Sequence, residues 1–199
     1  TAVASTVIGL ALAGPAAYAM AFYPNKRTDF LLVWMVSTKF IPAVGVLIPI
    51  YLVYSAVGLL DNALGLTLLF TAMNLPIIVW MVYSYFRDIP KDIVEAADID
   101  GASIMQTLFK VVLPLALPGL ASTGLLALIL AWNESFWSIT MTDHSAATLA
   151  VYIASFKSAE GLFWAKMSAA SVLAIAPIIV LGWFTQRQMV RGLTFGAVK

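Results

Sequence analysis

Five long stretches of this chain contain no charged residue, and this pattern limits the fold more than any other feature. A bilayer core about 30 Å thick requires roughly 20 apolar residues in an α-helix, and each stretch is that long. Helices that are apolar around their whole circumference would leave a soluble bundle no face for water. With 62% hydrophobic and 11% charged residues, the chain is therefore predicted to be an all-α integral membrane protein with five transmembrane helices. The uncharged stretches are residues 1–25, 40–60, 62–86, 111–133 and 167–186.

Turn-forming residues and prolines place the helices within these stretches. The first helix is expected to end near the Tyr23-Pro24-Asn25 breaker, and the second is expected to be one helix that contains Pro42 and Pro49. In the connection 138–162, a short surface helix is expected at 147–156. The second to fifth helices are expected at residues 30–54, 63–85, 115–137 and 163–185.

Basic residues are concentrated on alternate sides of the predicted spans, and such residues favour the cytoplasmic side of a membrane. The loops 23–29 and 87–114 and the tail 187–199 are therefore expected to be cytoplasmic. An odd number of spans then places Thr1 outside, so we expect a further N-terminal helix, six in all, in the full chain. The residues that carry this bias are Lys26, Arg27, Arg87, Lys91, Lys110, Arg187, Arg191 and Lys199.

The composition excludes several classes of function. The chain has no Cys and only His144 as a histidine, so thiolate and histidine-based metal sites are excluded. A net charge of +1 argues against nucleic acid as a partner. No Gly-Lys pair occurs, so the chain has no phosphate-binding loop and is not expected to hydrolyse ATP. Nor does it show the paired acids or Ser/His arrangement of an intramembrane enzyme.

The loop 87–114 is the one sizeable polar segment, and it has the pattern of two short helices joined by a turn. Pro90 suits the first turn of a helix, and Gly101 is placed to end it. Ser103 and Gln106 have the spacing of a capping box that begins a second helix, which runs towards Pro114. A solvated loop is the alternative, but the apolar stripe with two small alanines favours a docking surface. The stripe is formed by Ile89, Ile93, Ala96 and Ala97.

The same loop resembles the conserved loop of importer-type ABC permeases, because Glu95-Ala96-Ala97 is followed by Gly101 and then by Val111 and Leu113-Pro114 at the family's spacing. The family usually has Ile at the position of Val111. The longer form, residues 95–102, is similar to the carbohydrate-uptake (maltose-permease-like) branch. Three other segments agree with that branch, namely 59–62, 132–134 and 190–199. Residues 37–42 and 73–76 are most similar to sorbitol/mannitol polyol permeases.

The resemblance implies a type I importer permease with one transmembrane domain over residues 1–199 in a bacterial inner membrane. It implies a second permease subunit, two copies of a cytoplasmic ATPase that holds ATP and Mg²⁺, and an external solute-binding protein. In such permeases the loop helix docks in a groove of the ATPase. Glu95, Asp98 and Asp100 would then supply polar contacts, while Ala96 and Ala97 allow close packing.

A path for a sugar alcohol needs hydroxyl, amide and aromatic groups, since each solute hydroxyl that leaves water requires a replacement hydrogen bond. A charged residue at membrane depth is a functional candidate, which favours Lys39 and Glu134 as path residues. Alternatively, the Lys39 side chain reaches the membrane surface and Glu134 only holds the outer loop in place. Alternatively, Trp132 anchors the chain at the membrane interface, and Asn74 forms a hydrogen bond between two helices. The candidates are Ser37, Thr38, Lys39, Asn74, Trp132, Asn133 and Glu134.

Two rival functions remain at this point. A secondary transporter or channel would need several intramembrane acids, and it leaves the loop 87–114 without a role. A related permease for a disaccharide or for glycerol phosphate fits the same family pattern, although glycerol phosphate would favour more cations on the path.

Overall fold

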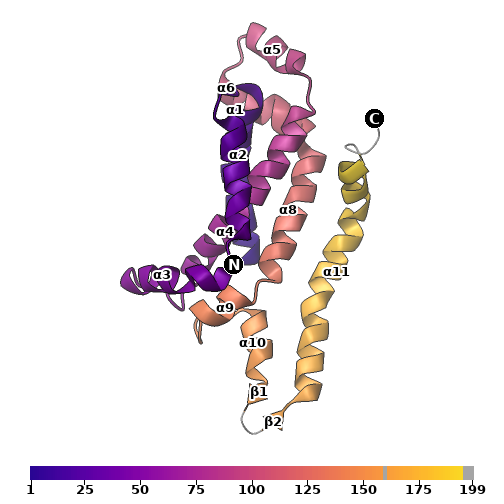
Figure 1. Ribbon diagram of the computed structural model, residues 1–199. Coiled ribbons are helices and arrows are strands. Elements are labelled where there is room, and N and C mark those ends of the chain that lie inside the picture. The colour runs from indigo at the N-terminus through magenta and orange to yellow at the C-terminus, as the bar shows by residue number, and fades with distance from the viewer. Residues whose placement is uncertain (159–160, 195–199) are drawn as a thin grey trace.

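The computed structural model describes residues 1–158 and 161–194, and these residues are almost entirely helical (Figure 1). Three of the described helices, α1, α4 and α11, are long and apolar enough to cross a membrane. Two bent pairs of helices bring the number of spans to five if each pair counts as one. The helices are α1 (Ala2–Phe22), α2 (Thr28–Ser37), α3 (Ala43–Ala56), α4 (Ala63–Arg87), α5 (Lys91–Ile99), α6 (Ile104–Thr107), α7 (Leu113–Leu115), α8 (Leu117–Trp132), α9 (Phe136–Met141), α10 (Leu149–Ser155) and α11 (Trp164–Thr194).

The centre of the bundle is formed by α1, α4 and α8, which contact one another, while α11 packs against α8. Small residues on α1 let α4 approach closely, as is usual between membrane helices. Ala13, Ala17 and Tyr18 of α1 share a buried cluster with Val82 and Phe86 of α4. This cluster occupies the half of the bundle nearer to α5, and a second cluster around Phe70 and Trp137 occupies the other half.

The second predicted span is not one helix, and this corrects the expectation of a continuous helix over 30–54. α2 passes into a short 3₁₀ turn, η1 (Thr38–Phe40), and the chain then bends by 95° into α3. Ile41 is extended, with φ −71° and ψ 122°, as the residue before a proline prefers to be. Pro42 begins α3, whereas Pro49 lies inside that helix without breaking it.

The fourth predicted span also differs from the expected 115–137. α6, a π-helical turn η2 (Leu108–Val112) and α7 form one continuous helical unit, which meets α8 at 79°. α8 ends at Trp132, and after residues 133–135 the separate helix α9 begins. The expected third helix at 63–85 is confirmed as α4. Asn62 caps its start, and the Asn62 side-chain oxygen accepts hydrogen bonds from the N–H groups of Leu64 and Gly65.

The remaining elements lie towards the end of the chain. The short helix expected at 147–156 is confirmed as α10, and the strands β1 (Lys157–Ser158) and β2 (Gly161–Leu162) pair in an antiparallel fashion after it. α11 is longer than the expected 163–185, because it includes the first part of the predicted tail 187–199. Residues 195–199 of that tail lie outside the described residues.

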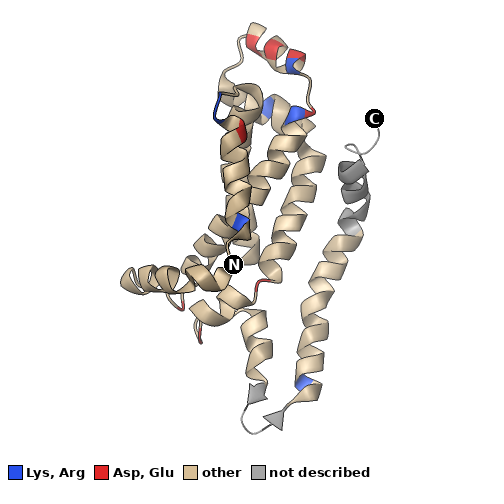
Figure 2. Ribbon diagram, viewed as in Figure 1, with Lys and Arg blue, Asp and Glu red and all other residues tan. Residues whose placement is uncertain are grey.

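Charged side chains are gathered at the ends of the bundle, as Figure 2 shows. The end that carries α5 includes the loop after α1 and the end of α4, so two of the loops predicted to share one side of the membrane lie together (Figure 1). Lys39 lies beside the middle of α4, because its ammonium donates to the carbonyl of Met73.

Candidate coupling surface and solute path

The helix α5 protrudes from one end of the bundle and ends in a tightly defined turn. The N–H of Gly101 donates to the carbonyl of Asp98 at 3.0 Å, and the N–H of Ala102 donates to that of Ala97 at 3.0 Å. This pair of bonds is the Schellman arrangement, which requires a left-handed residue just beyond the helix. Gly101 provides it with φ +79°. The sequence prediction of a helix ended by this glycine is confirmed.

One side of α5 is fixed to the bundle, and the rest is open. Val94 is only 5% exposed and joins the buried cluster that contains Phe86 and Tyr18. Glu95, Ala96, Asp98 and Asp100 are exposed and Ala97 is half-buried. Next to this turn, Ile99 is 86% exposed, which is unusual for a large apolar side chain unless another surface covers it.

The second helix of the loop begins with the predicted capping box. The N–H of Gln106 donates to the Ser103 hydroxyl at 3.4 Å, and the N–H of Ser103 donates to the Gln106 side-chain oxygen at 2.9 Å. Leu108 and Val112 of the π-helical turn are buried in the same cluster as Val94. Pro114 is exposed in the helix that follows. Both helices of the loop are therefore packed onto the bundle rather than suspended from it.

Lys39 and the middle of α4 are brought together by the break in the second span. The Lys39 ammonium donates to the carbonyl oxygen of Met73 at 2.9 Å. This carbonyl lies three residues before Pro76, on the turn where a proline disturbs helical hydrogen bonding. Asn74, the next residue, is buried. The structure therefore places two of the predicted path residues, Lys39 and Asn74, around one point of α4.

Ser37 and Thr38 bond within their own helix, so their hydroxyl protons are already engaged. Ser37 donates to the carbonyl of Trp34 at 2.7 Å, and Thr38 donates to that of Met35 at 2.6 Å. Their hydroxyl oxygens keep the capacity to accept from a solute.

The predicted path residues at and just after the end of α8 have hydrogen-bond partners within the fold. The Trp132 indole N–H donates to the carbonyl of Ala174 on α11 at 3.1 Å, and the Asn133 amide donates to that of Ile129 at 3.0 Å. The Glu134 carboxylate accepts from the N–H of Trp137 at 3.1 Å, at the start of α9. Glu134 is also within electrostatic range of Lys39. Trp132 lines two hollows of about 240 and 230 Å³ that open beside α10.

Asp61 has a role that the sequence analysis did not assign. Its carboxylate accepts hydrogen bonds from the N–H groups of the four residues 143–146, at 2.9–3.3 Å. Its own N–H donates to the carbonyl of Met141 at 2.9 Å, and its φ is +46°. The amide of Ser145, with those of Asp143 and Ala146, holds the pKa of the Asp61 carboxyl well below its usual range. Asp61 therefore clamps the α3–α4 loop to the loop after α9.

Solved structures share this overall fold. A bacterial ABC transporter involved in the import of the acidic polysaccharide alginate matches 94% of this chain and 70% of its own, with a TM-score of 0.76 and 28% identity. The MetNI methionine ABC transporter, in an inward-facing conformation, matches 96% of this chain and 92% of its own with a TM-score of 0.73. At 20% identity, the second likeness concerns the fold alone. The fold is that of a type I ABC importer permease.

The sequence defines the family. Residues 9–191 match the family described as binding-protein-dependent transport system inner membrane component, and the chain belongs to that family. The trehalose/maltose transport system permease protein MalG of Thermococcus litoralis is 34% identical over 98% of this chain and 70% of its own length. The sulfoquinovosyl glycerol transport system permease protein SmoH of Agrobacterium fabrum is 34% identical over 100% of this chain and 70% of its own length. The trehalose transport system permease protein SugB of Mycobacterium tuberculosis is 36% identical over 98% of this chain and 72% of its own length.

Proposed function

We propose that this chain is the permease subunit of an ATP-driven importer and moves a carbohydrate across the bacterial inner membrane. Its partners would be a second permease subunit, two copies of a cytoplasmic ATPase and an external solute-binding protein. The observation that supports the proposal is the arrangement of α5. One side of this helix is attached to the bundle through Val94, and the other side is exposed and free to dock.

Such a helix suits the transfer of motion from an ATPase. Closure of the ATPase dimer would move the groove that holds α5, and a rigid connection would pass this movement to α1 and α4. Coupling requires contacts that differ between two states, so a loosely attached loop would transmit little. Glu95, Asp98 and Asp100 offer carboxylates to the groove, while Ala96 and Ala97 let its backbone approach closely.

Carbohydrate is the solute class that the relatives support, since three of them are named for trehalose, for trehalose and maltose, and for sulfoquinovosyl glycerol. Within this class we propose a sugar alcohol of the sorbitol or mannitol type as the solute. The proposal is based on segments 37–42 and 73–76, which resemble those of polyol permeases. A disaccharide is the second candidate, favoured by the two trehalose relatives.

The proposed path passes the break in the second span. Discontinuous helices provide binding groups at membrane depth in many transporters, because their ends expose backbone polar groups. Here the Lys39 ammonium, which uses one of its three protons for the Met73 carbonyl, keeps two donors for solute hydroxyls. Asn74 and Glu134 add an amide and a carboxylate, and Ser37 and Thr38 add hydroxyl acceptors. Trp132 and Asn133, which line a hollow among α8, α10 and α11, would belong to the outer part of the route.

The substrate is tested by ATP hydrolysis of the reconstituted complex with its binding protein. Sorbitol, mannitol, trehalose, maltose and glycerol phosphate are supplied in turn. We expect a sugar alcohol to give the largest stimulation. Stimulation by trehalose or maltose alone would replace the sugar alcohol with a disaccharide. Stimulation by none of these solutes would reject the carbohydrate proposal.

Lys39→Met tests the path, with Lys166→Met as a control at the start of α11. We expect the first variant to keep basal ATP hydrolysis but to lose most solute uptake. Equal uptake by both variants would remove Lys39 from the path.

The orientation is tested with single cysteines, which are unique labels because the sequence contains no Cys. A membrane-impermeant maleimide added to intact spheroplasts should label Ser145→Cys and leave Ala96→Cys unlabelled until the membrane is opened. The reverse pattern would place α5 outside and would exclude docking to a cytoplasmic ATPase.

A further inference from the structure

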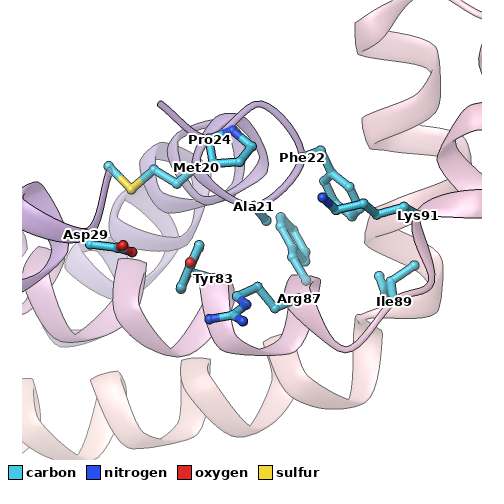
Figure 3. A pocket seen from close by; sticks show the side chains of 10 residues that line it. Met20, Ala21, Phe22, Pro24, Asp29, Tyr83, Arg87, Ile89 and Lys91 are labelled. Atoms are coloured by element: carbon cyan, nitrogen blue, oxygen red, sulfur yellow. The ribbon is translucent and has the colours of Figure 1, made fainter. Parts of the chain in front are cut away.

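A polar hollow of about 370 Å³ lies where α1 ends, α2 begins and α4 ends, at the same end of the bundle as α5 (Figure 3). Asp29, Tyr83, Arg87 and Lys91 are its polar lining residues. None of these belongs to the proposed solute path or to the docking face of α5. The hollow therefore needs an explanation of its own.

Two cations from separate elements line this hollow, and neither of them forms an ion pair within the described part of the chain. The Arg87 guanidinium lies 5.8 Å from the centroid of the Tyr83 ring, and Lys91 enters from the first turn of α5, as Figure 3 shows. Among the described residues the only ion pair joins His144 and Asp143, at the far end of the bundle. Both cations are exposed, so a ligand can reach them.

The one acid in the hollow does not cancel these charges. Asp29 lies in the first turn of α2, where a carboxylate is favoured by the helix dipole. With Arg87 and Lys91 in the same lining as this acid, the first hollow carries a net positive charge, and the next acid, Asp88, lines only the adjoining hollow. The ligand that complements it carries a single negative charge and also a donor, such as a hydroxyl, for Asp29.

The hollow continues along an apolar flank of the bundle. A second hollow of about 660 Å³ shares Asp29, Tyr83 and Arg87 with the first, includes Asp88 at its polar end, and extends over Val33 and Trp80, between α2 and α4. Val33 is 61% exposed and Trp80 40% exposed. A soluble anion would leave this apolar flank uncovered, whereas an acyl chain would cover it.

We propose that the two hollows form a binding site for an anionic phospholipid of the phosphatidylglycerol type. Its phosphodiester lies against Arg87 and Lys91, its glycerol hydroxyls donate to Asp29, and an acyl chain covers Val33 and Trp80. Basic pockets between membrane helices at the cytoplasmic face are suited to such headgroups. The site depends on the membrane setting and not on which solute is carried.

The test measures the lipid retained by the complete transporter in nanodiscs of phosphatidylcholine with one fifth phosphatidylglycerol, by native mass spectrometry after detergent extraction. We expect Arg87→Gln and Lys91→Gln each to reduce the retained phosphatidylglycerol about fivefold. Lys26→Gln and Lys110→Gln, which remove cations from the same end of the bundle but outside the hollow, should change it less than twofold. Val33→Asp should also release the lipid, because it places a charge against the acyl chain.

Competition distinguishes the sources of phosphate. Inorganic phosphate and glycerol phosphate at millimolar concentration should not displace the lipid. Displacement by either would show a site for a soluble anion, and equal loss in all four glutamine variants would show only a general attraction of basic residues to the membrane. Retention that is unchanged in Arg87→Gln and Lys91→Gln would also overturn the proposal.

Discussion

The N–H of Ser145 reaches both carboxylate oxygens of Asp61, at 3.1 and 2.9 Å, across more than eighty residues of sequence. Three neighbouring amides donate to the same carboxylate, so one half-buried side chain fixes the backbone of the loop after α9. Hydrogen bonds to an ionised group are stronger than neutral ones, and several bonds on one group restrict the loop to a single conformation.

Replacing Asp61 should loosen this loop without unfolding the bundle. In Asp61→Ala, the amides of residues 143–146 should exchange with solvent about tenfold faster, as expected for a segment released to local opening. Hydrogen exchange followed by mass spectrometry of the 142–148 peptide provides the measurement. Asp143→Ala serves as the control, since its side chain is not part of the clamp. Unchanged exchange in Asp61→Ala would mean that other contacts fix the loop.

The clamp should also respond to acid in a defined direction. Because its pKa in the folded chain is below the ordinary value of about 3.9, the Asp61 carboxylate stabilises the loop at all pH values above that value. This contribution is lost as pH falls below about 3.9 towards the folded pKa. A selectively ¹³C-labelled Asp61 carboxyl should therefore remain ionised at pH 4. An ordinary titration curve centred near pH 3.9 would contradict the clamp.

Val94 is expected to determine how well motion of α5 reaches the bundle. Val94→Ala removes buried apolar surface, at a cost of about 2 kcal/mol to the attachment of α5. The variant should bind the ATPase but transport less solute per ATP hydrolysed. Ile99→Ala is the matched comparison, because this exposed side chain should affect ATPase binding and not the attachment. Solute uptake per ATP, measured in proteoliposomes for both variants, separates the two roles.

Substitutions at Gly101 should act through the backbone alone. A Cβ at this residue would meet nothing within 4 Å, whereas φ of +79° disfavours a β-branched side chain. Gly101→Val should therefore cost about 1–2 kcal/mol in the turn and disconnect hydrolysis from uptake, while the protein still inserts. Gly101→Asn, which tolerates this conformation better, should keep more coupling. Full uptake by Gly101→Val would show that the turn is not needed.

A close contact between Gly119 and Tyr85 should make α8 sensitive to small changes. A Cβ on Gly119 would overlap the ring of Tyr85, so Gly119→Ala should force α8 and α4 apart and lower the thermal midpoint by several degrees. Tyr85→Ala in the same chain should restore much of the loss. Gly182→Ala, at a position with open space, is the control. A thermal shift equal to that of Gly182→Ala would exclude the overlap.

Local chemistry made the helices of the coupling loop predictable, whereas their packing was not. Pro90, Gly101 and the Ser103–Gln106 pair act within a few residues, so the sequence specifies them directly. Val94 was missed, because on so short a helix the sequence does not reveal which side meets the bundle. Asp61 was missed for a related reason, since its partners lie far along the chain.

Hydropathy likewise located the membrane spans but not their bends. A broken helix and a straight one have the same apolar composition, so the uncharged stretches gave no sign of the turn at Pro42. Proline content did not help either, because Pro15, Pro76 and Pro177 lie inside continuous helices. What distinguishes residues 38–42 is tertiary: Lys39 bonds to α4, and this contact becomes available only once the bundle has formed.

The break after Phe40 has a mechanical consequence. With α2 held to α4 through Lys39, a rotation of a few backbone dihedrals at residues 40–42 would swing α3 while α2 stays in place. Movement started at the far end of the bundle would then be converted at this elbow into sideways displacement of a single helix. Such a swing would release the face of α3 that packs against the cluster around Phe70 and Trp137, while the cluster around Tyr18 and Phe86 would stay intact.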